Sequence, residues 1–125
     1  MSTVRILCVD DDSRINELNR IALTRAGYEV ELASSPSDAL ERVGAESFDL
    51  VITDLSFPDS SETDFIAKLR TTAPALTIIL TSGNHYPPAE VLEQADAFVA
   101  KAYSVNSLTD SVRELLARDK LRRIS

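Results

Sequence analysis

DLVITDLSFP, residues Asp49–Pro58, joins an unbroken apolar run to one carboxylate, Asp54. A parallel strand that is covered by helices on both faces is apolar along its whole length, so Leu50–Thr53 predicts a central strand of an α/β sheet. Asp54 then lies at the carboxyl end of this strand. Ligands bind at that edge of open α/β sheets, at the point where the strand order reverses. The segment therefore predicts an α/β fold and a carboxylate placed for chemistry.

Composition limits the class of protein. The chain has 125 residues, which predicts one domain over residues 1–125. Its formal net charge of -7 argues against a nucleic-acid-binding surface, because phosphate contacts need clustered Lys and Arg. No apolar segment approaches the roughly 18 residues of a membrane span, and no apolar segment of a signal peptide follows Met1. We therefore expect a soluble, cytoplasmic protein that binds neither nucleic acid nor membrane.

Four further segments have the composition of strands: Val4–Val9, Tyr28–Ala33, Leu76–Thr81 and Ala97–Ala100. Helical patterns follow the strands, over Ser13–Ala26, from Ser35 to about Val43, around Phe65–Leu69, over about Pro88–Gln94, and after Ser104 through Leu116. The first helix is predicted from the spacing of Ile15, Leu18, Ala22 and Ala26. The alternation predicts a doubly wound parallel sheet, and right-handed crossovers favour the strand order 2-1-3-4-5.

Charged and polar residues stand at the predicted strand ends. The order 2-1-3-4-5 brings Asp10, Asp11 and Asp54 to one edge, where three carboxylates repel each other unless a hard divalent cation such as Mg2+ neutralises them. Magnesium shares its ligands readily with phosphate oxygens, so the cluster predicts a phosphoryl group beside it. Thr81 and Lys101 end neighbouring strands at the same edge. A phosphoryl group in transfer needs a metal ion and an ammonium group to neutralise its charge, and a carboxylate nucleophile to receive it.

Two residues near this edge have simpler expected roles. Asp12 precedes the first helix, and acids favour a helix N-terminus, so we expect it to cap that helix. Cys8, the single cysteine, lies inside an apolar strand. It is therefore expected to be a small buried hydrophobe and neither a disulfide partner nor a nucleophile.

The same positions give the chain a resemblance to a known family. The elements that carry it are Val9-Asp10-Asp11, Asp54 with Pro58 four residues later, Thr81-Ser82 after an apolar strand, and Phe98-Val99-Ala100-Lys101. In this register they are similar to the receiver domain of two-component response regulators, from Val4 to about Ala117. The resemblance implies a flavodoxin-like three-layer sandwich, with a doubly wound five-stranded parallel sheet in the order 2-1-3-4-5.

The resemblance also implies a role for each site residue. Asp54 would accept a phosphoryl group from a histidine kinase or a phosphotransfer protein. Mg2+ would be held by the carboxylates of Asp10, Asp11 and Asp54 and by the backbone carbonyl of Ser56. Lys101 would bind the phosphoryl group. A receiver of this kind is a signalling domain and not an enzyme, although it promotes its own phosphorylation and dephosphorylation.

A conformational switch is implied as well. Thr81 would move to hydrogen-bond the phosphoryl group and would draw Phe98 inward. This movement would remodel the face made by the fourth helix, the fifth strand and the fifth helix, which receivers commonly use to bind partners. The implied partner is a downstream protein or an effector domain. Formation of a homodimer is a further possibility that the resemblance allows.

Two positions depart from the family pattern and keep a second function open. Ala102 follows Lys101 where receivers normally have proline, and Glu62 stands where they usually have glycine. A cis peptide before a non-proline residue costs about 2.5–4 kcal/mol, which favours a trans bond before Ala102. These departures motivate the alternative of a degenerate receiver, which binds a partner without being phosphorylated.

A third function comes from another class. Asp10-Asp11-Asp12 after an apolar strand resembles the start of phosphatases of the haloacid-dehalogenase type, in which the first Asp is the nucleophile. The chain is short for that fold and lacks its later paired acids after a glycine. Phosphatase activity that depended on Asp10 and not on Asp54 would favour this alternative.

Overall fold

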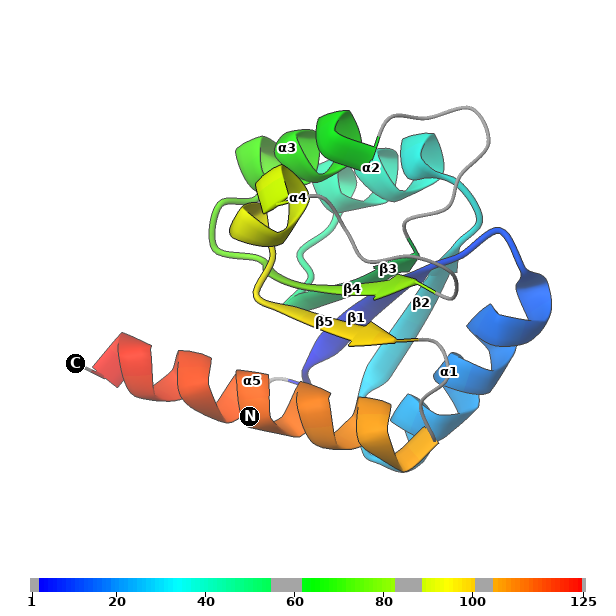
Figure 1. Cartoon of the computed structure of the whole chain (residues 1–125). Helices are drawn as coiled ribbons and strands as arrows, with labels where there is room; N and C mark the ends of the chain where they lie inside the picture. The colour runs from blue at the N-terminus through cyan, green and yellow to red at the C-terminus, as the bar shows by residue number, and fades with distance from the viewer. Residues whose placement is uncertain (1–2, 55–61, 83–88, 101–104, 125) are drawn as a thin grey trace.

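The computed structural model describes residues 3–54, 62–82, 89–100 and 105–124, with backbone only at 62–63, 105–107 and 119–124. In this part of the chain, five strands alternate with five helices (Figure 1). The strands are β1 Arg5–Val9, β2 Glu29–Ala33, β3 Leu50–Asp54, β4 Thr77–Ser82 and β5 Ala97–Ala100. The helices are α1 Ser13–Arg25, α2 Pro36–Ala45, α3 Glu62–Thr72, α4 Ala89–Gln94 and α5 Val105–Ile124.

The sheet has the topology that the sequence predicts. Its order is β2-β1-β3-β4-β5, and every neighbouring pair of strands is parallel. The register pairs Val9 with Thr53 and Asp54 with Thr81. The carboxyl ends of β1, β3 and β4 therefore lie side by side in the middle of one edge.

Helices cover both faces of the sheet and make a three-layer sandwich (Figure 1). Successive side chains of a strand point to opposite faces. Accordingly, Leu7 and Val51 pack into the core under α2, α3 and α4, whereas Cys8 and Ile52 pack into the core against α1 and α5. All five residues of β3 are buried, which explains why its sequence is apolar without alternation.

Local sequence signals fix several helix ends. The Ser35 hydroxyl accepts a hydrogen bond from the Asp38 N–H at 3.2 Å and caps α2. The Asp12 carboxylate accepts one from the Arg14 N–H at 2.9 Å, so its predicted role as the cap of α1 is confirmed. Gly27 follows α1 with a φ of 101°, a left-handed conformation that other residues rarely adopt.

One expectation about α1 is wrong in its detail. The spacing that predicted the helix includes Leu18, yet this side chain is 58% exposed. The face that α1 buries carries Asn16, Asn19 and Leu23. Hydrophobic spacing is a poor guide here, because the buried Asn16 bonds backbone carbonyls at the strand ends.

Most of the remaining boundaries differ from the prediction by one or two residues, and α5 differs by more. β4 begins and ends one residue later than Leu76–Thr81, and α2 continues to Ala45 instead of ending near Val43. α5 continues to Ile124, well beyond the predicted apolar stripe that ends at Leu116. Pro88 and Ser104, the expected starts of the fourth and fifth helices, lie outside the described residues.

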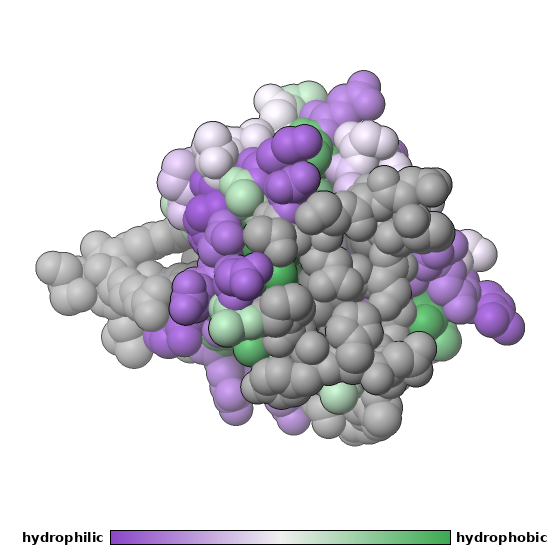
Figure 2. Space-filling view, turned by 45° about the horizontal axis from the view of Figure 1, so that its top comes forward, coloured by the Kyte–Doolittle hydropathy of each residue, from purple (hydrophilic) through white to green (hydrophobic). Residues whose placement is uncertain are grey.

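The described surface has few large apolar side chains. On the face that Figure 2 shows, hydrophilic residues form most of the coloured surface and hydrophobic residues form small separate areas. Among the described side chains, the exposed large hydrophobic ones are Leu18 and Ile21, both on α1. No helix within the described ranges has both the length and the hydropathy to cross a membrane.

Candidate functional site

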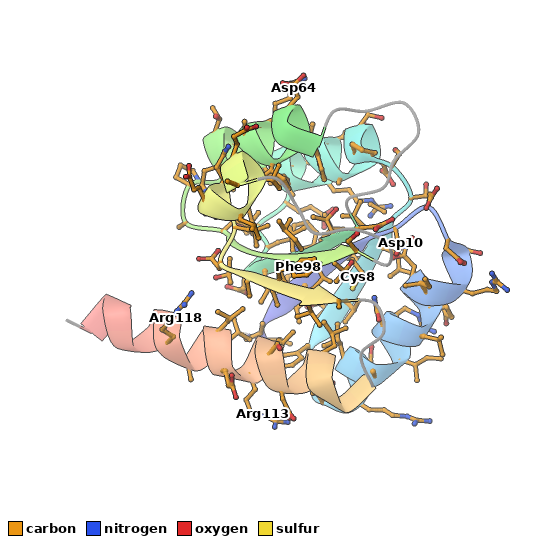
Figure 3. The ribbon with its side chains drawn as sticks, in the orientation of Figure 1. Cys8, Asp10, Asp64, Phe98, Arg113 and Arg118 are labelled. Atoms are coloured by element: carbon orange, nitrogen blue, oxygen red, sulfur yellow. The ribbon has the colours of Figure 1, made fainter. Side chains whose placement is uncertain are left out.

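Three carboxylates meet at the carboxyl edge of the sheet. Asp10 and Asp11 follow β1, Asp54 ends β3, and one oxygen of each lies within 4.8 Å of the others. Asp10 and Asp54 are each only 3% exposed, whereas Asp11 is exposed. Figure 3 labels Asp10 at the end of β1. The structure therefore brings together the three acids that the sequence places at this edge.

Asp10 is held by its neighbours on the chain and in the sheet. Its N–H donates to the Ala33 carbonyl at 3.2 Å, which extends the ladder between β1 and β2 by one residue. Its Oδ1 accepts a hydrogen bond from the Asp12 N–H at 2.9 Å. The carboxylate is thereby turned back toward the start of α1.

Thr81 lies beside Asp54 in the sheet, as predicted. The two residues are register partners, and both are buried. The Thr81 hydroxyl donates to the Thr53 carbonyl over 3.3 Å, and the Thr53 hydroxyl donates to the Asp54 carbonyl at 2.9 Å. The longer of these bonds exceeds the usual 2.7–2.8 Å of an O–H···O bond by about 0.5 Å, so Thr81 is weakly held in this position.

Phe98 is half-buried on β5 and packs against the core under α2, α3 and α4 (Figure 3). The other predicted site residues, Ser56 and Lys101, lie outside the described residues, as do Pro58 and Ala102. Glu62 begins α3 with a helical backbone, in agreement with its poor fit to a left-handed conformation.

The donor set at this edge suits a hard divalent cation. All three donors are carboxylates, and two of them are buried, where like charges are costly unless a cation or a proton neutralises them. Magnesium takes oxygen ligands and commonly uses one or two carboxylates together with water and phosphate oxygens. The residues present therefore fit Mg2+.

The family of the chain follows from its match to a family model. The model of the response regulator receiver domain matches residues 6–113. The chain belongs to this family. Response regulator MprA of Mycobacterium ulcerans is 32% identical over 122 residues, which cover 95% of this chain and 53% of that protein. The receiver chain thus spans about half the length of this curated relative.

Solved receiver structures share the fold. A CheY-like receiver domain protein from Methanospirillum hungatei JF-1 has a TM-score of 0.88 and 29% identity, over 97% of this chain and 99% of that one. Response regulator TrrA from Thermotoga maritima, in complex with Mg(2+)-BeF, has a TM-score of 0.83 and 32% identity, over 90% and 99% of the two chains. The flavodoxin-like fold is confirmed, and membership of a signalling family favours a receiver over the phosphatase alternative.

Cys8 lies in the core beneath this edge of the receiver and is 1% exposed. Burial raises the pKa of its thiol to about 12, and the nearby negative charge of Asp10 adds to the shift. The thiol is therefore protonated at neutral pH. The burial of Cys8 confirms the expectation of a small buried hydrophobe.

Acids at the opposite, amino edge of the sheet have a different environment. The Asp49 carboxylate accepts a hydrogen bond from the Arg5 N–H at 2.9 Å. The Arg5 guanidinium pairs with Glu46 at 2.8 Å, donates to the Ser47 carbonyl at 2.9 Å, and lies 4.7 Å from the centre of the Phe48 ring. Arg5 therefore joins β1 to the segment that leads into β3.

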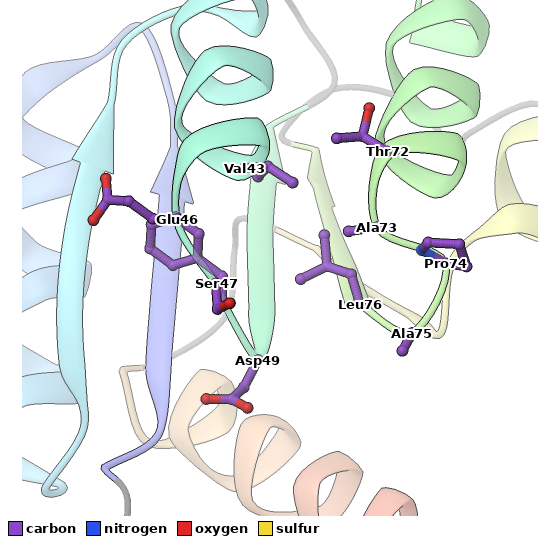
Figure 4. Close-up of a pocket in the computed structure, with 10 residues that line it drawn as sticks. Val43, Glu46, Ser47, Asp49, Thr72, Ala73, Pro74, Ala75 and Leu76 are labelled. Carbon is purple, nitrogen blue, oxygen red and sulfur yellow. The ribbon is translucent and has the colours of Figure 1, made fainter.

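A cavity of about 300 Å³ also opens at the amino edge, between the ends of α2 and α3 (Figure 4). Its lining residues are Val43, Glu46, Ser47, Phe48, Asp49, Thr72, Ala73, Pro74, Ala75 and Leu76. The two acids of this lining are both bound to Arg5. The cavity is therefore separate from the carboxylate cluster at the other edge.

Asp96 is a second structural acid, and no pattern in the sequence indicates its contacts. Its carboxylate accepts the Ile78 N–H at 2.8 Å and pairs with Arg70 at 3.3 Å and with Arg118 at 3.5 Å. Arg70 also donates to the Gln94 carbonyl at the end of α4. One side chain thus connects α3, β4 and α5 at the start of β5.

Asn16 is another residue near the site that no sequence pattern identifies. This residue is 4% exposed and lines a cavity of about 280 Å³ between α1, the end of β2 and the start of α2. The available signal was an amide at a helix position six residues after Asp10. That signal does not reveal a contact, because it does not say which carbonyls the folded chain brings near.

Proposed function

We propose that this receiver accepts a phosphoryl group on Asp54 in two-component signalling. The observation that carries the proposal is the convergence of Asp10, Asp11 and Asp54 at the carboxyl edge of the sheet, with oxygens within 4.8 Å. This edge, near the point where the strand order reverses, is where open α/β sheets bind ligands. A carboxylate nucleophile beside a cation-binding acid pair suits phosphoryl transfer.

The chemical step is a transfer from nitrogen to oxygen. A carboxylate oxygen of Asp54 attacks the phosphorus of a phosphohistidine on the kinase or phosphotransfer protein. The new O–P bond forms as the P–N bond breaks, and the leaving imidazole nitrogen keeps the bonding electrons and takes a proton from solvent. Asp54 becomes an acyl phosphate, which water later hydrolyses to restore the carboxylate.

The chain's oxygen donors would hold Mg2+ during this step. Asp10, Asp11 and Asp54 supply carboxylates, and the backbone carbonyl of Ser56 is proposed as a fourth ligand. When bound, Mg2+ supplies positive charge that offsets the charge of the phosphoryl oxygens and of the acids. The complex of the TrrA structure with Mg(2+)-BeF supports this choice of metal.

Lys101 and Thr81 are proposed to contact the transferred group. Lys101 directly follows β5 and would place its ammonium against a phosphoryl oxygen. Thr81 would give up its long hydrogen bond to the Thr53 carbonyl and donate to the phosphoryl group instead. Because Thr81 and Asp54 are register partners, this change requires only a side-chain rotation.

The output would follow from the movement of Thr81. Phe98 would move inward, and the face made by α4, β5 and α5 would change shape for a downstream protein, an effector domain or a second copy of the chain. Phe98 is only half-buried, so it has room to pack more deeply. Interfaces and cores that have two discrete arrangements can amplify such small local shifts.

Direct labelling tests the proposal. The purified protein is incubated with Mg2+ and acetyl phosphate, and acid-labile phosphate is measured by mass spectrometry before and after acid treatment. We expect one phosphate on the wild type and none on Asp54→Ala or in excess EDTA. The matched control is Asp110→Asn, which neutralises an exposed acid of α5 and should label like the wild type.

Two results would overturn the proposal. Label that survives in Asp54→Ala would place the acceptor elsewhere. A wild type that neither labels nor binds Mg2+ at millimolar concentration would favour the degenerate receiver, which binds its partner without phosphorylation.

A further inference from the structure

The side-chain amide of Asn16 bridges the ends of two strands. Its Nδ2 donates to the carbonyl of Asp10, just beyond β1, and to the carbonyl of Ala33, the last residue of β2, both at 3.0 Å. The residue lies one turn into α1 and is 4% exposed. Asn16 therefore ties the helix to the point where the chain leaves the sheet.

Only the amide nitrogen can make these contacts, because both neighbours are carbonyl oxygens. An amide nitrogen carries two hydrogens, so its whole donor capacity is used. The Oδ1 atom of Asn16 is buried and has no hydrogen-bond partner among the described residues. A buried acceptor without a partner costs stability. The benefit of an asparagine at this position therefore comes from its two donated bonds.

The hydrogen bond from Asn16 is one of three that hold Asp10 in place. The Asp10 N–H is bound to Ala33, its carbonyl to Asn16, and its Oδ1 to the Asp12 N–H. Both peptide groups that flank the Asp10 Cα are therefore fixed. The direction of the Asp10 side chain, and of the chain that enters Asp11, depends on this fixed backbone.

We infer that Asn16 is a positioning residue of the metal site, which it serves by holding Asp10 and Asp11 in the arrangement that binds Mg2+. The inference rests on the proposed function for the metal itself. Asn16 bonds the backbone carbonyl of Asp10, so it acts on the Asp10 carboxylate through the backbone. Residues that orient metal ligands in this way typically contribute a factor of about 10–100 to metal affinity.

Metal affinity provides the test, with Asn19 as the matched control. Asn19 is a second buried asparagine on the same face of α1, one turn farther from the strand ends. Mg2+ dissociation constants are measured by isothermal titration calorimetry for the wild type, Asn16→Ala and Asn19→Ala. We expect Asn16→Ala to weaken Mg2+ binding by at least about tenfold and Asn19→Ala to leave it unchanged.

A second pair of variants guards against loss of the fold. Asn16→Leu removes both donors but also the unpartnered acceptor, and it fills most of the vacated space. Asn19→Leu is its control, and melting temperatures in EDTA show how far each variant is destabilised. At saturating Mg2+, labelling with acetyl phosphate should return to the wild-type extent in Asn16→Leu, because the defect lies in metal affinity.

The outcomes separate the inference from the proposed function. Equal Mg2+ affinity in the wild type and both folded Asn16 variants would overturn the inference and leave the function standing. The inference is also overturned if the Asn19 variants lose as much affinity, because the loss would then follow stability. A wild type that binds no Mg2+ overturns the proposed function and the inference together.

Discussion

The two edges of the sheet surround their aspartates differently. At the amino edge, Asp49 and Asp96 accept backbone N–H bonds, and Asp96 also pairs with two arginine side chains. At the carboxyl edge, the carboxylates of Asp10, Asp11 and Asp54 lie next to each other. The residue type is the same, and the neighbours differ.

This difference separates the acids that stabilise the fold from the acids of the proposed site. An acid with a cationic neighbour and a backbone donor joins elements together, as Asp96 joins α3, β4 and α5. Acids that crowd together raise the energy of the folded chain, and a cation or a phosphoryl–cation pair lowers it again. Removing one acid from each edge should therefore have effects of opposite sign.

The largest effect is expected at the amino edge, for Asp96→Ala. The substitution leaves the buried Ile78 N–H without its acceptor and removes the shared partner of Arg70 and Arg118. We expect the free energy of unfolding to fall by about 2–3 kcal/mol, as for a hydrogen-bonded charge that is largely buried. Urea denaturation measures this loss.

An exposed pair of the same chemistry provides the control for Asp96. Asp110 pairs with Arg113 at 3.3 Å on α5, and both side chains are well exposed. Asp110→Ala should change the free energy of unfolding by less than about 0.5 kcal/mol. Equal losses in the two variants would show that Asp96 has no special structural role.

The next effect concerns the pH dependence of stability, through Cys8. Its pKa is about 12 in the folded protein and near 9 in an unfolded chain, so the unfolded state loses the proton first as pH rises. The stabilising contribution is complete below about pH 9 and is lost as pH rises toward 12. Between pH 8 and pH 10, the wild type should lose about 1.4 kcal/mol more stability than Cys8→Ala.

Paired urea titrations at the two pH values, under reducing conditions, measure this difference. Parallel losses in the wild type and Cys8→Ala would mean that the thiol ionises equally in the folded and unfolded states. Addition of Asp10→Asn removes only the second cause of the shift, and burial still keeps the folded-state pKa above this pH range. The loss between pH 8 and pH 10 should therefore stay almost unchanged in that variant.

The smallest effect is expected at the carboxyl edge, for Asp11→Asn in EDTA. Removal of one of three crowded carboxylates relieves repulsion, and because Asp11 is exposed the melting temperature should rise by only about 2 °C. The same variant should gain less stability from added Mg2+ than the wild type. Thermal melts with and without Mg2+ provide both values.

Glu17→Gln serves as the control for Asp11. This exposed acid of α1 pairs with Arg20, which lowers the pKa of the Glu17 carboxyl. Neutralising Glu17 removes an attraction, so the melting temperature should not rise. A fall in melting temperature for Asp11→Asn would contradict the view that the carboxyl edge is crowded.

The sequence predicted the fold well because its strands are buried and their ends are polar. The run Leu50–Thr53 identified the central strand, and alternation with helices predicted a doubly wound parallel sheet, for which 2-1-3-4-5 is a common strand order. The cluster of Asp10, Asp11 and Asp54 followed from that order, since residues after parallel strands share one edge. Short-range patterns identified the elements, and the general rules of doubly wound sheets supplied their order.

Short-range patterns do not predict contacts between polar residues that are far apart in the sequence. Arg5 and Asp49 are 44 residues apart, and Arg70 and Asp96 are 26 apart, so nothing local marks them as partners. Asn16 was missed for a related reason. A buried amide breaks the hydrophobic spacing of α1, and its value depends on two carbonyls that only the folded chain brings together.

The anchoring of β5 at one end has a mechanical consequence. β5 is the last strand of the sheet, so its backbone is bonded to a neighbour on one side only, and Asp96 fixes its start. Its four residues rise about 3.3 Å each, which places Ala100 about 13 Å from Asp96. A tilt of about 4° around Asp96 would therefore shift Ala100 by about 1 Å while the start of the strand stayed still. Such a tilt would carry β5 along its pairing with β4 and would move mainly its end at the carboxyl edge.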